Sequence, residues 1–205
     1  GALDMILGEE LPIDRSASAI EMAETMFGDG VTIVSASYTG DRDSSGIYTN
    51  GNSVSPGVTP SDTGVMFSTG DLRGFTNSLH LFTGANQSSN TTTNSSGPNN
   101  NAEFNAAAGA RTYDASFIDV DFIPTGDLLT MQFIFASEEY PEYADGSFQD
   151  FVGVWVNGAQ IELGVGDGDI DPNNLNAGAN GNLFIDNTND DYNTEMDGFT
   201  VTLTL

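Results

Sequence analysis

Hydrophobic positions recur with a helical period near the start of the chain. Within residues 11–29 they are spaced three and four apart, at Ile20, Ala23, Met26 and Phe27. Polar side chains able to cap a helix precede them at Asp14, Ser16 or Ser18, and the glycines on either side of Asp29 end the pattern. The spacing predicts one helix within residues 11–29.

After residue 30 the hydrophobic period changes from helical spacing to the alternation of strands. Strands are predicted at 31–38, 64–68, 115–123, 128–137, 151–156, 160–163, 183–185 and 199–205. Asn157-Gly158 is a strong two-residue hairpin signal, and a short helical turn is predicted at 102–108. The predicted fold is all-β: an antiparallel, jelly-roll-like β-sandwich with a short N-terminal helix and long Asp/Asn/Gly loops.

The chain is long enough for one such domain. We interpret residues 1–10 as a cloning remnant or linker and residues 11–205 as a single β-sandwich domain. The last predicted strand places Val201, Leu203 and Leu205 on one face, and no turn follows it. We therefore expect the domain to be truncated at its C-terminus, with an open strand edge that favours self-association.

Acidic residues dominate the charge. The chain has 30 Asp and Glu residues against four Lys and Arg, which gives a formal net charge of −26. This charge repels nucleic acids and anionic membrane surfaces, and no apolar run is long enough to insert into a membrane. Divalent cations would relieve the self-repulsion; adaptation to a saline habitat is the other explanation for the charge.

Two acidic clusters offer the oxygen ligands that Ca²⁺ prefers. The first comprises Glu138, Glu139, Asp145 and Asp150. Asp150 opens the returning strand, so it is expected to meet Glu138 or Glu139 across the loop; a solvated acidic loop is the alternative. The second cluster alternates carboxylates with other residues and resembles half of a calcium loop, at Asp167, Asp169 and Asp171. It lacks the terminal glutamate of an EF-hand, and a flexible polar loop is its alternative.

Other acidic residues favour ordinary roles. Asp41 and Asp43 flank Arg42, which favours ion pairing over metal binding. Asp119 and Asp121 share one strand face, where solvent exposure is favoured over a metal-directed role.

Aromatic residues supply candidate ligand contacts at Tyr140, Tyr143 and Trp155. For Trp155, core packing is favoured and a sugar-stacking platform is the alternative. Catalysis is poorly supported because the chain has no cysteine and a single histidine, His80. Glu138 and Glu139 are consecutive on a strand and point to opposite faces, so they do not form a glycosidase pair, although Asp150 with either remains geometrically allowed. We expect the protein not to be an enzyme.

The segment 133–143, Phe-Ile-Phe-Ala-Ser-Glu-Glu-Tyr-Pro-Glu-Tyr, and the segment 148–153 that follows it resemble the signature of the choice-of-anchor L domain family. Further segments resemble that family in the same order, at 31–40, 66–70, 119–127 and 197–200. The resemblance covers about residues 17–205. It implies a bacterial exported or cell-surface protein, and it implies further strands beyond the last one in this chain.

Two functional hypotheses follow. The first is a calcium-dependent ligand-binding (adhesion) module of a large bacterial cell-surface or secreted protein, which binds peptide, protein or glycan ligands. A calcium ion with an open coordination position would let this acidic surface capture a carboxylate or vicinal hydroxyls. The alternative is a structural or assembly module of an extracellular filament or matrix, in which calcium is purely structural.

Overall fold

The predicted N-terminal helix forms, but it begins later than expected. The structure, a computed structural model, describes residues 9–76, 94–138, 140, 150–161 and 181–204. Helix α1 spans Ala19–Phe27; Ser18 caps it by accepting a hydrogen bond from the Glu21 amide, and Gly28 ends it with a φ of 61°. Residues 11–18 are not helical because Ile13–Asp14 form strand β1, whose pairing with another strand outweighs the local pattern.

The longest strand pair confirms two of the predicted strands. β2 (Val31–Thr39) and β5 (Phe117–Pro124) run antiparallel, with a β-bulge between Ile33 and Ser35. Helix α1 packs on one face of the pair, where the Phe27 and Phe122 ring centroids are 4.9 Å apart. Asp119 and Asp121 are exposed, as the alternation predicted.

A second sheet was only partly predicted. Its order is β1, β3 (Ser45–Tyr48) and β4 (Gly64–Phe67), and the short helices α2 (Gly51–Val54) and η2 (Leu72–Phe75) accompany it. β4 was predicted, whereas β3 and α2 were not. β3 (Ser-Gly-Ile-Tyr) and α2 (Gly-Asn-Ser-Val) contain too few apolar residues to give a recognisable pattern, and the strand pairing itself stabilises β3.

The C-terminal half forms shorter strands than predicted. The predicted strand 128–137 becomes β6 (Gln132–Phe133) and β7 (Ala136–Ser137), and the predicted strand 199–205 becomes β11 (Gly198–Thr200) and β12 (Leu203–Thr204). β11 pairs with both β10 (Phe184–Asp186) and β7, while β12 pairs with β6. The breaks let one chain segment contribute to two small sheets.

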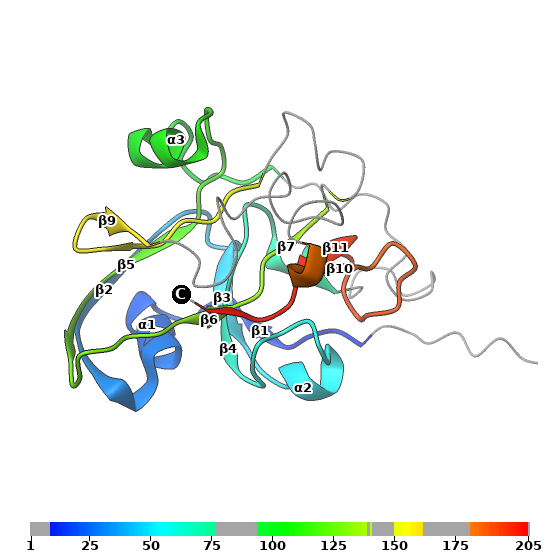
Figure 1. Cartoon of the computed structure of the whole chain (residues 1–205), viewed down its shortest axis with the longest axis horizontal. Helices are drawn as coiled ribbons and strands as arrows, with labels where there is room; N and C mark the ends of the chain where they lie inside the picture. The colour runs from blue at the N-terminus through cyan, green and yellow to red at the C-terminus, as the bar shows by residue number, and fades with distance from the viewer. Residues whose placement is uncertain (1–8, 77–93, 139, 141–149, 162–180, 205) are drawn as a thin grey trace, which may run out of the picture.

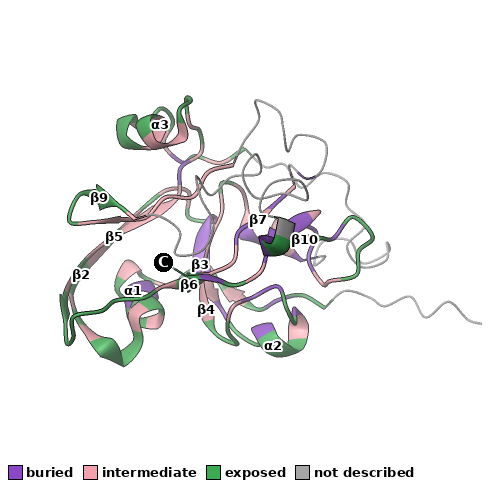
Figure 2. Cartoon of the chain, in the orientation of Figure 1, coloured by how far each residue is buried: buried purple, intermediate pink, exposed green. Residues whose placement is uncertain are grey.

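The core cluster lies between these strands and contains Phe135, Tyr140, Leu183 and Leu203. Figure 2 shows buried residues around β7 and β10 and exposed residues along β2. The connection from β10 to β11 is organised by the buried Asn187. Its Nδ2 donates to the carbonyls of Thr194 and Met196, and its Oδ1 accepts from the Tyr192 amide.

The predicted hairpin and the predicted helical turn are both confirmed. β8 (Trp155–Val156) and β9 (Ala159–Gln160) are joined by Asn157 and Gly158, whose φ angles of 50° and 80° are those of a type I′ turn. Helix α3 spans Ala102–Ala108 and is capped by Asn101.

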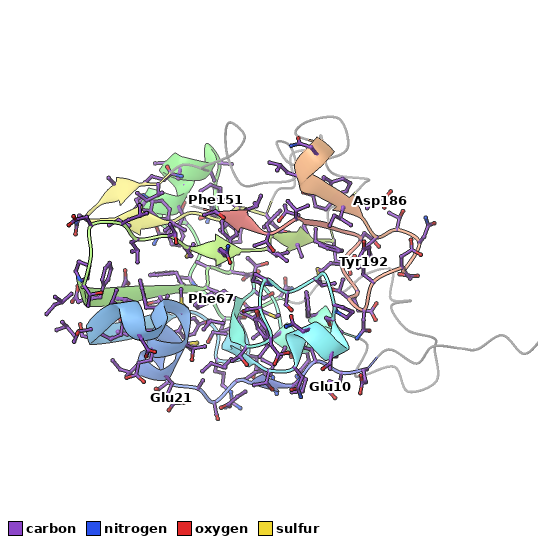
Figure 3. All side chains as sticks on the ribbon, turned by 60° about the horizontal axis from the view of Figure 1, so that its bottom comes forward. Glu10, Glu21, Phe67, Phe151, Asp186 and Tyr192 are labelled. Atoms are coloured by element: carbon purple, nitrogen blue, oxygen red, sulfur yellow. The ribbon has the colours of Figure 1, made fainter. Side chains whose placement is uncertain are left out.

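Antiparallel strands in several small sheets therefore build an all-β, sandwich-like fold, as predicted. Figure 1 shows the β2–β5 pair on one side of the molecule and the β10–β11 strands on the other. In Figure 3, α1 lies below β5, and β6, β7, β10 and the β8–β9 hairpin lie above both.

Candidate functional site

The candidate site is built on the two ends of the acidic segment 138–150. Ser137 ends β7, where it pairs with Gly198 of β11, and its side chain is buried. The Ser137 Oγ donates a 2.7 Å hydrogen bond to Asp150 Oδ2. The sequence predicted that Asp150 meets Glu138 or Glu139 across the loop. In the structure its carboxylate instead contacts Ser137, the residue just before Glu138.

The electrostatic environment of Asp150 disfavours its charged form. Asp150 as a whole is partly exposed, yet its carboxyl lies deep among protein atoms. This burial raises the pKa of Asp150 above the usual carboxyl value, and the Ser137 hydrogen bond only partly opposes it. A cation at this carboxylate would stabilise its ionised form.

None of the four arginines supplies that positive charge. Arg15 pairs with Asp43 and Asp71, Arg42 with Asp43, and Arg73 with Asp71, while Arg111 lies over the Tyr113 ring. Within the described part of the chain, Asp150 therefore has a hydroxyl partner and no cationic one. A bound ion or a proton would supply the positive charge that the described residues do not bring to this carboxylate.

Most of the other predicted metal ligands lie outside the described residues. Glu138 is described and partly buried. Those not described are Glu139, Asp145, Asp167, Asp169 and Asp171. Over the described residues, no group of three or more His, Asp or Glu side chains is arranged to hold a metal ion. The calcium site thus stays a prediction, with Asp150 and Glu138 as its described members.

The Asp41 and Asp43 carboxylates already have internal partners. Asp41 accepts hydrogen bonds from the Asp43 amide and from the amide and hydroxyl of Ser96, at 2.8 to 2.9 Å. These bonds, the Asp43 amide first, lower the pKa of Asp41. Asp43 lies 2.9 Å from Arg15 and 3.8 Å from Arg42. Ion pairing with Arg42 was predicted, whereas the contacts of Arg15 and Ser96 come from distant parts of the chain and leave no local sequence signal.

The candidate aromatic residues make packing contacts. Tyr140 is 1% exposed, and its ring lies 4.7 Å from that of Phe184. Trp155 is partly buried and stacks on Phe104 of α3 at 5.4 Å. Tyr143 lies outside the described residues, as does His80. A ligand-binding role for these aromatic residues stays a prediction.

Sequence reasoning did not identify Ser137 as the partner of Asp150. Ser137 lies at the end of a predicted strand and is followed by two glutamates, which were predicted as the metal ligands instead. The pairing of β7 with β11, which fixes the position of Ser137, joins residues about sixty positions apart. Only the fold reveals that contact.

Comparison with known proteins agrees with the resemblance seen in the sequence. The choice-of-anchor L domain family matches residues 13–205. Comparison with curated proteins finds no match, and comparison with solved structures finds none either. Among the described residues, no helix has the length and apolar character needed to cross a membrane. The chain belongs to the choice-of-anchor L domain family and is a module of a surface-associated bacterial protein.

Proposed function

We propose that this domain is a calcium-dependent ligand-binding module that serves adhesion and is not an enzyme. The observation that carries the proposal is the Asp150 carboxylate, which is held by Ser137, has its pKa raised by burial, and lacks a cationic side chain among the described residues. A divalent cation would neutralise this buried carboxylate and complete its coordination.

Calcium fits this position better than the softer transition metals. The acidic segment offers oxygen ligands only, and the chain has no cysteine to favour softer metals. The two ends of the segment are fixed: Ser137 belongs to a paired strand, and Asp150 is hydrogen-bonded to it. The net charge of −26 adds a general attraction for divalent cations.

A ligand role follows from the location of the protein and the nature of the ion. A surface-associated module meets peptides, proteins and glycans outside the cell. Calcium bound by a short acidic segment keeps coordination positions for other oxygen atoms, such as those of a peptide carboxylate or of vicinal sugar hydroxyls. The ion thereby lets a strongly acidic protein bind another anion.

Array binding tests this function. The wild-type domain, Asp150→Asn and Asp119→Asn are applied to glycan and peptide arrays in 10 mM calcium or in EGTA. Asp119 is exposed on β5, so its variant controls for the loss of one charge. We expect calcium-dependent hits for the wild type and for Asp119→Asn, and at least tenfold weaker signals for Asp150→Asn. Hits that persist in EGTA would contradict the proposal. An absence of hits together with calcium-dependent stability would instead support the structural module.

A further inference from the structure

A second surface feature does not include Asp150 in its lining. A cleft of about 350 Å³ opens between β5, the bulge of β2, the residues that follow β5, and the β8–β9 hairpin. Its walls include Val34, Leu129 and Val156, so aliphatic side chains form much of its surface. Figure 1 shows these segments close together at the β2–β5 side of the molecule.

Exposed aliphatic side chains line this cleft at Val34 and Leu129. Val34, which is 61% exposed, lies at the β-bulge, where the extra residue redirects its side chain. Leu129 in the wall is 42% exposed, and its neighbour Leu128 is 84% exposed. Clustered exposed aliphatic residues mark an interaction surface more often than scattered ones do.

The cleft also carries negative charge. Asp121 and Asp127 both line it. Asp121 accepts a hydrogen bond from the Ser35 hydroxyl, and within the described residues no arginine forms an ion pair with either carboxylate. An aliphatic cleft with two carboxylates in its wall complements a segment that carries both aliphatic and cationic side chains.

The neighbouring backbone favours an extended polypeptide as the occupant. In the described part of the chain, β5 has β2 as its single strand partner. Among these residues, the edge of β5 away from β2 is not paired with a strand, and an added strand could bond its N–H and C=O groups. A second copy of this chain is disfavoured because each copy carries a charge of −26.

We propose that the cleft bounded by Val34, Leu129, Asp121 and Asp127 binds an extended peptide segment of a partner protein in which aliphatic residues alternate with lysine or arginine. The aliphatic side chains enter the cleft and the cationic ones meet the two carboxylates. This site needs no metal ion, so it is independent of the calcium-dependent function.

Fluorescence anisotropy tests the proposal with a labelled, capped heptapeptide that alternates valine and lysine, in EGTA at physiological salt. Two matched peptides replace lysine by glutamate or valine by alanine. We expect the valine–lysine peptide to bind, the glutamate peptide to give no binding, and the alanine peptide to bind at least fivefold more weakly. Equal binding of the lysine peptides that contain valine and alanine would overturn the proposal, because non-specific attraction to the acidic surface would then account for it.

Variants locate the binding site. Asp121→Asn with Asp127→Asn should weaken binding about tenfold, and Val34→Thr, which keeps the side-chain shape at an exposed position, about threefold. Glu24→Gln with Asp191→Asn removes the same charge from exposed positions outside the cleft and should leave the affinity unchanged. Equal weakening by the two charge pairs, or no binding by the wild type, would overturn the proposal. So would self-association that Val34→Thr abolishes, because it would assign the cleft to a second copy.

Discussion

Ser137 and Asp150 are joined by a 2.7 Å hydrogen bond that closes the acidic segment between them. Ser137 is held by the pairing of β7 with β11, so this contact ties the segment to the C-terminal sheet. The aspartate is partly buried without a cationic partner among the described residues, and its preference for a proton or a metal ion leads to the first two predictions.

The stability of the metal-free protein should depend on the pH through Asp150. Burial raises the pKa of Asp150 in the folded state, so the folded protein holds this proton more tightly than the unfolded chain. The stabilisation that this proton gives to the fold is fully present below the unfolded pKa of about 3.9. It is lost as the pH rises through the pKa of Asp150 in the folded state. In EGTA at pH 7, Asp150→Asn should therefore have a higher free energy of unfolding than the wild type.

Urea titrations of both proteins from pH 3 to pH 8 measure this difference. The two free energies of unfolding should converge below a pH of about 4. A variant that is less stable than the wild type at pH 7 in EGTA would show that the Asp150 carboxylate is satisfied without a metal ion.

Calcium should stabilise the wild-type fold. A site with a dissociation constant of about 10⁻⁴ M, in calcium at a hundred times that concentration, adds roughly 2.7 kcal/mol to the free energy of unfolding. Calorimetry in 10 mM calcium and in EGTA should give a clearly higher Tm with calcium, and Asp150→Asn should lose most of the increase. Magnesium at the same concentration controls for the general effect of charge screening. An unchanged Tm would count against a bound ion.

Gly198 should tolerate no larger side chain. A Cβ at Gly198 would lie 2.6 Å from the Tyr140 ring and 2.7 Å from that of Phe184, both part of the packed core. Gly198→Ala should therefore cost about 1–3 kcal/mol, as overpacking usually does. Gly30→Ala is the matched control, since a Cβ there has no neighbour within 4 Å among the described residues. Chemical denaturation compares the two, and equal losses would show that the crowding at Gly198 is relieved by movement.

Asn187 should be important for the β10–β11 connection. Its buried side chain forms three hydrogen bonds to backbone groups, so Asn187→Ala leaves those groups unpaired. We expect a loss of about 2–3 kcal/mol. Asn52→Ala, at an exposed position of α2, should cost less than about 0.5 kcal/mol. Similar urea midpoints for the two variants would mean that water replaces the Asn187 bonds.

The sequence predicted those elements whose patterns are long or chemically distinctive. The alternation of β5 and the Asn157-Gly158 turn are local signals that were identified, and Ser18 was one of three candidate helix caps. β1 and β3 were not predicted because they are short and are stabilised by pairing with each other.

The candidate site was predictable to the same extent. The return of Asp150 to the end of the preceding strand followed from the loop between two predicted strands. Its bond to Ser137 did not, because the register of β7 on β11 is a long-range property. The cleft beside β5 also depends on such packing, since Val34 and Leu129 come from separate segments that only the fold brings together.

Isothermal titration of calcium into the metal-free wild type, Asp150→Asn and Asp119→Asn tests the central claim most directly. The wild type and Asp119→Asn should each bind calcium with a dissociation constant of about 10⁻⁴ to 10⁻³ M, as extracellular calcium modules do. Asp150→Asn should lose at least one such site. Wild-type protein that binds no calcium in this range, or Asp150→Asn that binds as many ions with the same affinity, would contradict a calcium site at Asp150.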